Sequence, residues 1–394
     1  MALVVVGLML KPADWLLGWV ADTQRRHLLR LDGNAQWRHT SNEFDYTFRT
    51  NRLGLRGPDV AFAKPNGSRR VLVIGDSFVA GIGVDDRDVF TSVLARRWRK
   101  SKIEVVNLGR AGTSTIRELT LYQELGRRFE PDVVILVYYL GNDLAEVVEE
   151  QDATEQAAWR PQGTLRRVVY ACCPNVYCEL AIQKRLARTR AQMGPRTNGQ
   201  IVRRIRDEAT EAGIDPDLAE RRYTSLPDDV RRMARDGQFP EYRYLQACLF
   251  PRRFQNSIDP DDEFFRPAWA RTEQSLDQLK RAVEADEAQL MLVVVPEAVQ
   301  VVASSMSFNK DLGFVVDPGW LEEKPGRTAE ALAGWAQRSG VPLLEMLKPL
   351  RESHESTYYV EDGHWTIAGH RVMAERLSQW KPLVGTVAPA GNTR

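Results

Sequence analysis

The chain has 394 residues, of which 43% are hydrophobic and 27% are charged, and its 54 Lys and Arg residues nearly balance 53 Asp and Glu. This length is enough for one large domain with insertions, or for two domains, and either can bury a sizeable core. The formal net charge of +1 argues against the broad positive surface that binds nucleic acids, so no nucleic-acid partner is expected.

The chain opens with an apolar stretch whose role the sequence leaves open. "ALVVVGLML" ends at Leu10, and Lys11, Pro12 and Asp14 separate it from the apolar "WLLGWV". It is shorter than the roughly 20 residues that span a bilayer. We therefore interpret residues 1–40 as an anchor-like segment and linker, compatible with a truncated membrane anchor, a helix lying at the membrane surface, or a helix packed on the domain.

Five apolar runs predict the strands of a parallel sheet. Each is rich in Val, Ile and Leu, as in strands buried on both faces, and helix-patterned polar sequence follows. They cover residues 69–77, 103–109, 131–143, 288–296 and 341–346. Strands that alternate with helices in this way predict an α/β fold with a doubly wound, five-stranded parallel sheet.

The spacing of these runs also predicts the domain organisation. Residues 144–287 separate the third run from the fourth, and a single crossover helix needs a much shorter segment. We expect this segment, which is charged and helical in pattern, to form a helical insertion or cap. The core then comprises residues 41–143 and 288–382, and residues 383–394 form a flexible tail.

The four cysteines leave several interpretations open. Cys172, Cys173 and Cys178 cluster in "ACCPNVYCEL", and Cys248 lies far downstream. Adjacent cysteines rarely pair with each other, so a disulfide scheme would contain one local and one long-range bridge. Free buried thiols are the main alternative. A zinc site is disfavoured because the usual C-x2-C pairs do not occur.

Small and polar residues follow four of the predicted strands. Ligands of such sheets bind outside the carboxyl ends of the strands, so these residues are candidates for chemistry. The first run ends in Gly-Asp-Ser, the third ends in Gly-Asn-Asp, and an Asp-Gly-His sequence follows the fifth. With a glycine after the second run, the candidate site residues are Ser77, Gly112, Asn142, Asp362 and His364.

These five residues have the chemistry of a serine nucleophile site. A serine hydroxyl becomes a nucleophile when a base takes its proton, and an acid orients that base. Ser77 supplies the hydroxyl, His364 the base and Asp362 the acid. The backbone N–H groups of Ser77 and Gly112, with the side-chain amide of Asn142, form the expected oxyanion hole. Taken singly, Ser77 and Asn142 could instead cap turns, and His364 could be a structural histidine.

Cofactor and metal sites find little support in the sequence. The glycines of "GDSFVAGIG" lack the G-x-G-x-x-G spacing of a dinucleotide site, and no G-x-x-x-x-G-K-[ST] motif occurs. Asp76 and Asp143 have no partner at the spacing of metal ligands. We therefore expect neither a cofactor nor a metal.

The motifs together resemble those of the SGNH/GDSL hydrolase family. Four blocks occur in family order: "GDSF" with Ser77, "NLGRAG" with Gly112, "GND" with Asn142, and "DGH" with Asp362 and His364. The resemblance implies a three-layer α/β/α sandwich, the flavodoxin-like SGNH hydrolase fold, and a serine esterase that works through an acyl-enzyme. The segment "NEFDYTFRTNRLGLRG" is similar to the one before the first strand in bacterial membrane-linked members, which implies a membrane-associated or extracytoplasmic protein of the envelope.

One departure from the family pattern bears on the reaction. Many esterases of the family separate the acid and the histidine by two residues, whereas one residue separates Asp362 from His364, and Glu361 lies at the longer spacing. The form "DGHW", with Trp365, instead resembles polysaccharide O-acetyltransferases such as the alginate enzymes.

The expected function is therefore hydrolysis of an acyl ester, by preference of an O-acetylated carbohydrate, with a small acylated molecule as the other substrate class. Transfer of the acyl group to a polysaccharide is the alternative, because both reactions share the acyl-enzyme. A second alternative is a non-catalytic carbohydrate-binding or assembly protein, with partners in an envelope-polysaccharide system.

Overall fold

The computed structural model describes residues 11–17, 33–149, 164–191, 195–322 and 324–387. Its centre is a five-stranded parallel sheet with the strand order β4-β3-β5-β6-β7. The strands are β3 (Arg69–Gly75), β4 (Ile103–Gly109), β5 (Val133–Tyr139), β6 (Gln289–Val295) and β7 (Leu343–Glu345). The predicted sheet is confirmed, and each strand lies at or within its predicted bounds.

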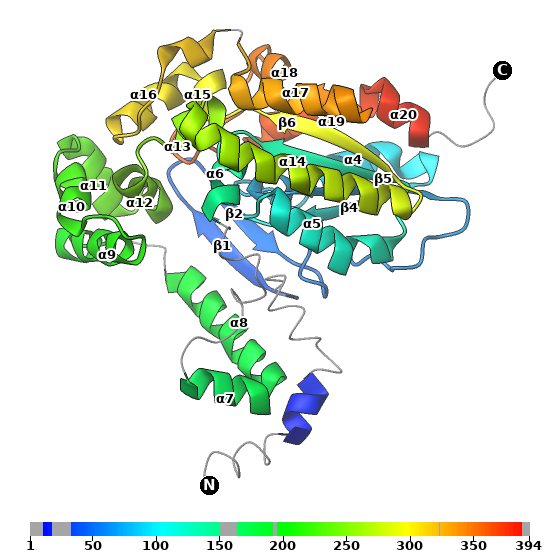
Figure 1. Cartoon of the computed structure of the whole chain (residues 1–394), viewed down its shortest axis with the longest axis horizontal. Coiled ribbons are helices and arrows are strands. Elements are labelled where there is room, and N and C mark those ends of the chain that lie inside the picture. The colour runs from blue at the N-terminus through cyan, green and yellow to red at the C-terminus, as the bar shows by residue number, and fades with distance from the viewer. Residues whose placement is uncertain (1–10, 18–32, 150–163, 192–194, 323, 388–394) are drawn as a thin grey trace.

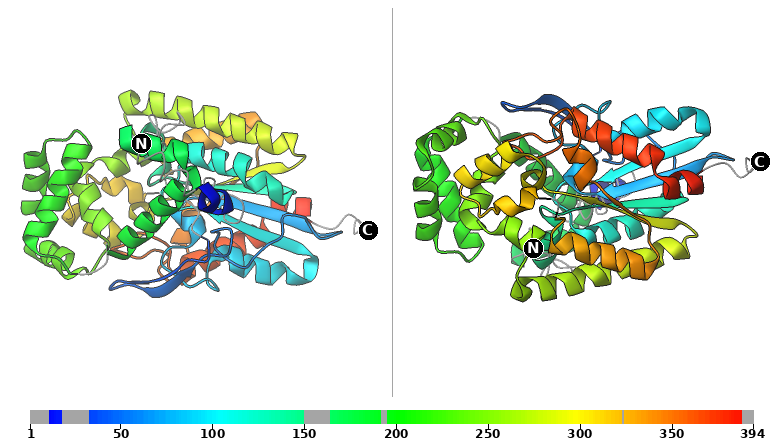
Figure 2. Two further views of the ribbon diagram at one scale, coloured as in Figure 1. Left: turned by 90° about the horizontal axis from the view of Figure 1, so that it is seen from below. Right: turned by 90° about the horizontal axis from the view of Figure 1, so that it is seen from above.

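Helices cover both faces of this sheet, because alternate residues of each strand point to opposite sides. In β3, Leu72 and Ile74 face one layer while Val71 and Val73 face the other. The first layer contains α5 (Thr115–Glu124), α14 (Asp262–Ala285) and α17 (Arg327–Ser339). The second contains α4 (Phe90–Trp98), α18 (Leu347–Arg351), α19 (Ile367–Gln379) and α20 (Lys381–Val387). Figures 1 and 2 show the resulting three-layer α/β/α sandwich, as expected.

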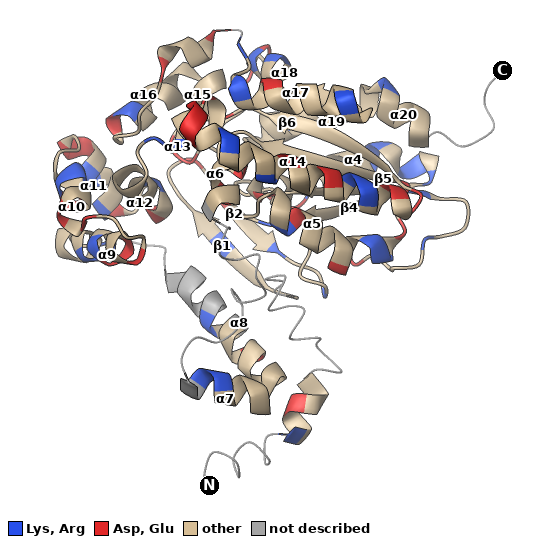
Figure 3. Ribbon diagram, in the orientation of Figure 1, with Lys and Arg blue, Asp and Glu red and all other residues tan. Residues whose placement is uncertain are grey.

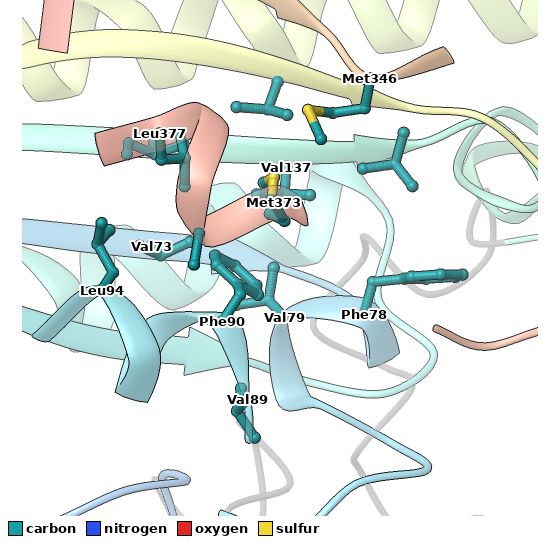
Figure 4. Close-up of a cluster of buried hydrophobic side chains, with 14 of the residues drawn as sticks. Val73, Phe78, Val79, Val89, Phe90, Leu94, Val137, Met346, Met373 and Leu377 are labelled. Carbon is teal, nitrogen blue, oxygen red and sulfur yellow. The ribbon is translucent and has the colours of Figure 1, made fainter. Parts of the chain in front are cut away.

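The second layer holds helix α19 against the sheet. Sheet and helix side chains interdigitate there (Figure 4), among them Val73, Val137, Phe90, Leu94, Met373 and Leu377. Burying each such side chain contributes roughly 1.5–3 kcal/mol. This packing also fixes the loop that enters α19, which carries Asp362 and His364.

The segment between β5 and β6 is helical, but only part of it lies apart from the sheet. Its helices are α6 (Asp143–Glu149), α7 (Thr164–Cys172), α8 (Pro174–Ala191), α9 (Asn198–Glu211), α10 (Pro216–Thr224), α11 (Asp228–Asp236), α12 (Glu241–Leu249), α13 (Arg253–Ile258) and α14. Helix α14 buries Leu276, Leu279 and Val283 in the first layer, so the predicted insertion of residues 144–287 extends too far.

Helices α9–α13, residues 198–258, pack around a separate hydrophobic cluster and are called the cap below. This cluster also takes in Met306 and Phe314, which come after β6, where α15 (Ala298–Val301) and α16 (Ala303–Asp311) lie. The cap is therefore joined to the core by shared packing. Helices α7 and α8 lie away from the sheet in Figure 1, beside the N-terminal helical residues 11–17, where Asp14 Oδ1 accepts the Asn175 backbone N–H at 2.8 Å.

Both predicted terminal segments are shorter than expected. Strands β1 (Gln36–Thr40) and β2 (Asp45–Arg49) form an antiparallel hairpin, so the expected linker of residues 1–40 already contains a strand. The expected tail of residues 383–394 begins inside α20, where Leu383 and Val387 are buried. Residues 1–10 and 18–32 of the predicted anchor-like segment and linker, and residues 388–394 of the predicted tail, lie outside the described residues. In the parts of the chain that are described, no helix has the length and apolar character needed to cross a membrane.

The cysteines and the surface charges complete the description. All four cysteines are free thiols, so the disulfide scheme does not occur in this structure.

Lys and Arg alternate with Asp and Glu along the surface helices (Figure 3). On α9, for example, Arg206 pairs with Asp217 at 2.7 Å and with Glu220 at 2.6 Å. Such exposed pairs add little stability, but they balance the Arg-rich run of α9.

Candidate active site

Ser77 lies at a sharp turn between β3 and the short helix α3 (Ser77–Ala80). Asp76 caps this helix, and its carboxylate accepts the Phe78 N–H at 2.9 Å. The turn needs Gly75, because a Cβ there would lie 2.9 Å from the Val137 carbonyl oxygen. The Gly-Asp-Ser sequence thus places the serine hydroxyl just beyond the carboxyl end of β3, where ligands of such sheets bind.

His364 and Asp362 approach Ser77 from the far end of the chain. The His364 Nε2 atom lies 2.8 Å from Ser77 Oγ, across 287 residues of sequence. The His364 Nδ1 atom lies 2.5 Å from Asp362 Oδ1, which also accepts the His364 backbone N–H at 3.2 Å. The three side chains that the sequence singled out therefore form one continuous chain of contacts.

Each member of the Asp362–His364 pair favours the charged form of the other. Burial alone would raise the pKa of the Asp362 carboxyl, but the charge and hydrogen bond of His364 outweigh it and lower that pKa. Burial would lower the pKa of His364, yet the charge and hydrogen bond of Asp362 outweigh it and raise that pKa. Asp362 therefore stays ionised, and an imidazolium at His364 is stabilised when it forms.

Glu361, the alternative acid, is placed differently. In the described parts of the chain, the His364 ring bonds to Asp362 and Ser77, not to Glu361. The Glu361 backbone N–H donates to Glu43 Oε2 at 2.9 Å. Burial, followed by the nearby charge of Glu43, raises the pKa of the Glu361 carboxyl to about 7. The geometry thus favours Asp362 as the partner of His364.

A cavity of about 610 Å³ opens onto these residues. All five predicted site residues line it, namely Ser77, Gly112, Asn142, Asp362 and His364. The cap supplies another wall, with Phe239, Tyr242 and Arg243 at and near the start of α12, and His39 of the β1–β2 hairpin closes a further side. The cavity therefore lies between the sheet, the hairpin and the cap.

The two remaining oxyanion candidates differ in how they are held. Gly112 has φ +69°, in the left-handed region that favours glycine, and nothing lies within 4 Å of where its Cβ would be. The left-handed backbone conformation, and not a lack of space for a side chain, explains why this position is a glycine. Asn142 Nδ2 donates to Glu146 Oε1 at 3.0 Å, and the Asn142 side chain also bonds to Asp76. The amide of Asn142 is thus engaged by two carboxylates at the cavity wall.

Asp76 and Asp143 are buried beside this amide without forming a metal centre. Burial raises the pKa of Asp76 to about 6, and burial with the charge of Glu118 raises that of Asp143. Asp143 Oδ2 accepts the Tyr139 N–H at 2.9 Å. Within the described ranges, no group of three or more His, Cys, Asp or Glu side chains is arranged to hold a metal ion.

A comparison with protein families supplies an assignment for this arrangement. The model of a family described as "SGNH hydrolase-like domain, acetyltransferase AlgX" matches residues 254–384, which include Asp362 and His364. Residues 254–384 are thus similar to the SGNH hydrolase family. Ser77, Gly112 and Asn142 lie outside the matched residues, in the SGNH sequence blocks described above. A comparison with curated protein sequences gives no match.

Several solved structures match this chain at low sequence identity and low TM-score. The crystal structure of TesA has 12% identity and a TM-score of 0.39, covering 80% of this chain and 99% of that one. A lipolytic protein of the G-D-S-L family from Desulfitobacterium hafniense DCB-2 has 13% identity and a TM-score of 0.36, covering 79% and 99%. A catalytic mutant of Axe2, an acetylxylan esterase from Geobacillus stearothermophilus, has 9% identity and a TM-score of 0.35, covering 82% and 96%.

Glu43 is a residue of the candidate site that the sequence did not single out. Its carboxylate accepts the backbone N–H groups of Val360, Glu361 and Asp362, at 2.5 to 2.9 Å. Hydrogen bonds to a charged acceptor are stronger than those between neutral groups. Glu43, in the β1–β2 connection, therefore fixes the loop that carries the acid and the histidine. No sequence signal links it to a loop 319 residues away.

The raised pKa of Glu361 should make the folded chain less stable as the pH rises. The ordinary value of 4.5 applies to the unfolded chain, while the folded value is about 7. The folded state binds more protons between these values, so the free energy of unfolding falls across this window. Because Glu361 is partly exposed, solvent screens the effect. We expect Glu361→Gln to raise the free energy of unfolding by about 1 kcal/mol at pH 8, with no gain near pH 4.

Chemical denaturation at the two pH values measures this difference. The matched control is Glu345→Gln, which removes an exposed carboxyl outside the loop. If Glu361→Gln changed the free energy of unfolding equally at both pH values, the raised pKa of Glu361 would be contradicted.

Proposed function

We propose that the chain is a serine-dependent SGNH esterase that hydrolyses acyl esters, by preference O-acetyl esters of a carbohydrate. The observation that carries this proposal is the chain of contacts from Ser77 through His364 to Asp362 at the wall of the cavity. A nucleophile, a base and an orienting acid at these distances are what acyl transfer requires.

In the first half of the proposed reaction, Ser77 becomes acylated. His364 Nε2 takes the Ser77 proton as Oγ attacks the acyl carbon, and Asp362 stabilises the imidazolium. The bond to the leaving alcohol then breaks, and His364 returns the proton to the alkoxide. In the second half, water loses a proton to His364 and attacks the acyl carbon. The bond to Oγ breaks, and His364 gives the proton back to Ser77.

The developing oxyanion needs hydrogen-bond donors throughout. We assign this role to the backbone N–H groups of Ser77 and Gly112 and to the Asn142 amide, all at the cavity wall. The N–H of the first helical residue, Ser77, has no acceptor within its own helix. Asn142 would take up this role by exchanging its bond to Glu146 for one to the oxyanion.

O-acetyl transfer to a polysaccharide is the second candidate. It differs only in the acceptor, because a sugar hydroxyl replaces water in the second half. Two observations favour it: the matched family is described as an acetyltransferase, and Trp365 follows His364 in the Asp-x-His-Trp form. The 2.8 Å contact between Ser77 and His364 argues against the non-catalytic alternative, which has no need of it.

The purified chain, a fluorophosphonate probe and a short-chain aryl acetate test the proposal, with and without neutral oligosaccharide acceptors. We expect covalent labelling at Ser77 and release of acetate. Acetylated oligosaccharide in place of free acetate would move the assignment to the transferase. A folded chain that neither reacts with the probe nor turns over the ester would contradict both enzyme assignments.

A further inference from the structure

Asp362 is bound on two sides, and only one of them belongs to the proposed triad. Its Oδ1 atom faces His364. The Tyr242 hydroxyl lies 3.3 Å from its Oδ2 atom and 3.1 Å from its backbone carbonyl oxygen, so it can donate to both. Tyr242 belongs to α12 of the cap, 120 residues away in sequence. The cap thus reaches the acid through a contact that the proposed triad does not use.

The next residue of the cap, Arg243, brings a positive charge to the same place. It is buried, with 4% of its surface exposed. It donates to Asn309 Oδ1, and its guanidinium lies over the rings of Phe254 and Phe314. Its Nη1 atom lies 3.5 Å from where a Cβ on Gly363 would be. Arg243 is therefore held beside Gly363, the residue between Asp362 and His364.

We propose that Tyr242 and Arg243 are positioning residues, by which the cap orients Asp362 and sets the proton affinity of His364. This inference rests on the proposed function. Neither residue is assigned a step of its own in the reaction. Both act through Asp362, and the cap becomes a part of the active site as well as a wall of the cavity.

The electrostatics of the pair agree with this role. Tyr242 is 37% exposed as a whole, but its hydroxyl is enclosed against Asp362. This local burial, followed by the charge of Asp362, raises the pKa of Tyr242 well above its ordinary value, so the hydroxyl stays protonated and donates. Arg243 lowers the pKa values of Asp362 and His364. The other titratable groups that interact with Asp362 or His364 come from several elements: Asp76, His39, Glu297, Glu43, Tyr46, Tyr359 and His370.

Removing either residue should therefore raise the pKa of His364. A carboxylate that loses a donor keeps more negative charge on the oxygen facing the imidazole, and this stabilises the imidazolium. His364 acts as a base only when it is neutral. The acidic limb of the pH profile for kcat/KM should then move to higher pH.

Tyr242→Phe tests this with the smallest change, because it removes only the hydroxyl. We expect kcat on the aryl acetate to fall about tenfold with KM little changed, and the acidic limb to move upward. The pH dependence of fluorophosphonate labelling should move in parallel. Tyr223→Phe is the matched control, since it removes a cap hydroxyl that bonds to Asn198 at 3.3 Å. It should leave both profiles in place.

Arg243→Lys and Arg243→Gln test the charge separately. The lysine variant keeps the charge and should preserve most of the wild-type pH profile, while the glutamine variant should shift it upward. Unshifted profiles in both Tyr242→Phe and Arg243→Gln would overturn the inference. The inference would also be overturned if activity fell together with the melting temperature while the pH profile stayed in place. Failure of the wild-type chain to react would instead contradict the proposed function itself.

Discussion

Replacing Ser77 by alanine is expected to lower turnover of an aryl acetate by several powers of ten and to abolish fluorophosphonate labelling. The Ser77 hydroxyl contacts His364 at 2.8 Å and lies 3.4 Å from Asp76 Oδ2. Without it, no oxygen stands where the acyl group must attach, and only substrate binding and oxyanion stabilisation remain. Alanine is smaller than serine and fits the start of α3, so the variant should fold.

Steady-state kinetics of the wild-type and variant chains measure the loss of turnover, and circular dichroism measures whether the variant folds. Ser275→Ala is the matched control, because it removes a buried hydroxyl from α14, where it bonds to the Arg271 carbonyl oxygen. It should retain activity near the wild-type value. A Ser77→Ala chain that keeps most of its activity would refute the serine mechanism.

Replacing Asp362 by asparagine should give the second large loss, of roughly 10³–10⁴ in kcat. Asp362 Oδ1 is 2.5 Å from His364 Nδ1, and an amide there can neither hold the same tautomer as well nor stabilise the imidazolium. Glu361→Gln should cost far less, because the Glu361 backbone is held by Glu43 and its carboxylate is not the partner of His364.

The two variants are nearly isosteric changes of neighbouring residues, so they form a matched pair. Comparing the kcat values of the two variants on one substrate at one pH shows which carboxylate acts as the acid. A larger loss from Glu361→Gln than from Asp362→Asn would transfer the role of the acid to Glu361, the residue at the longer family spacing.

The sheet could be predicted because its strands are buried on both faces. In β3 the four residues Val71, Leu72, Val73 and Ile74 are all fully buried, and such a run is visible in the sequence. The rule that ligands bind beyond strand ends then singled out Ser77. In the structure, the Ser77 hydroxyl lies 2.8 Å from His364 Nε2.

The remaining parts could not be predicted, for two physical reasons. Tyr242 and Glu43 reach Asp362 and its loop over sequence separations of 120 and 319 residues, and no local pattern encodes such contacts. Helix α14 follows the cap after only a short non-helical break, residues 259–261. Its amphipathic face alone does not reveal that Leu276 and Leu279 pack on the sheet and not on the cap.

The contact of Tyr242 with Asp362 also bears on how such enzymes diversify. Ser77 begins α3, just beyond the end of β3, and His364 lies in the loop before α19, while much of the cavity wall comes from the cap. A lineage could change its substrate by exchanging the cap and keeping the sheet. Each new cap would nevertheless have to bring its own donor for the acid. Specificity and rate would then be inherited together, and chimaeras that ignore this contact would bind a new substrate but process it slowly.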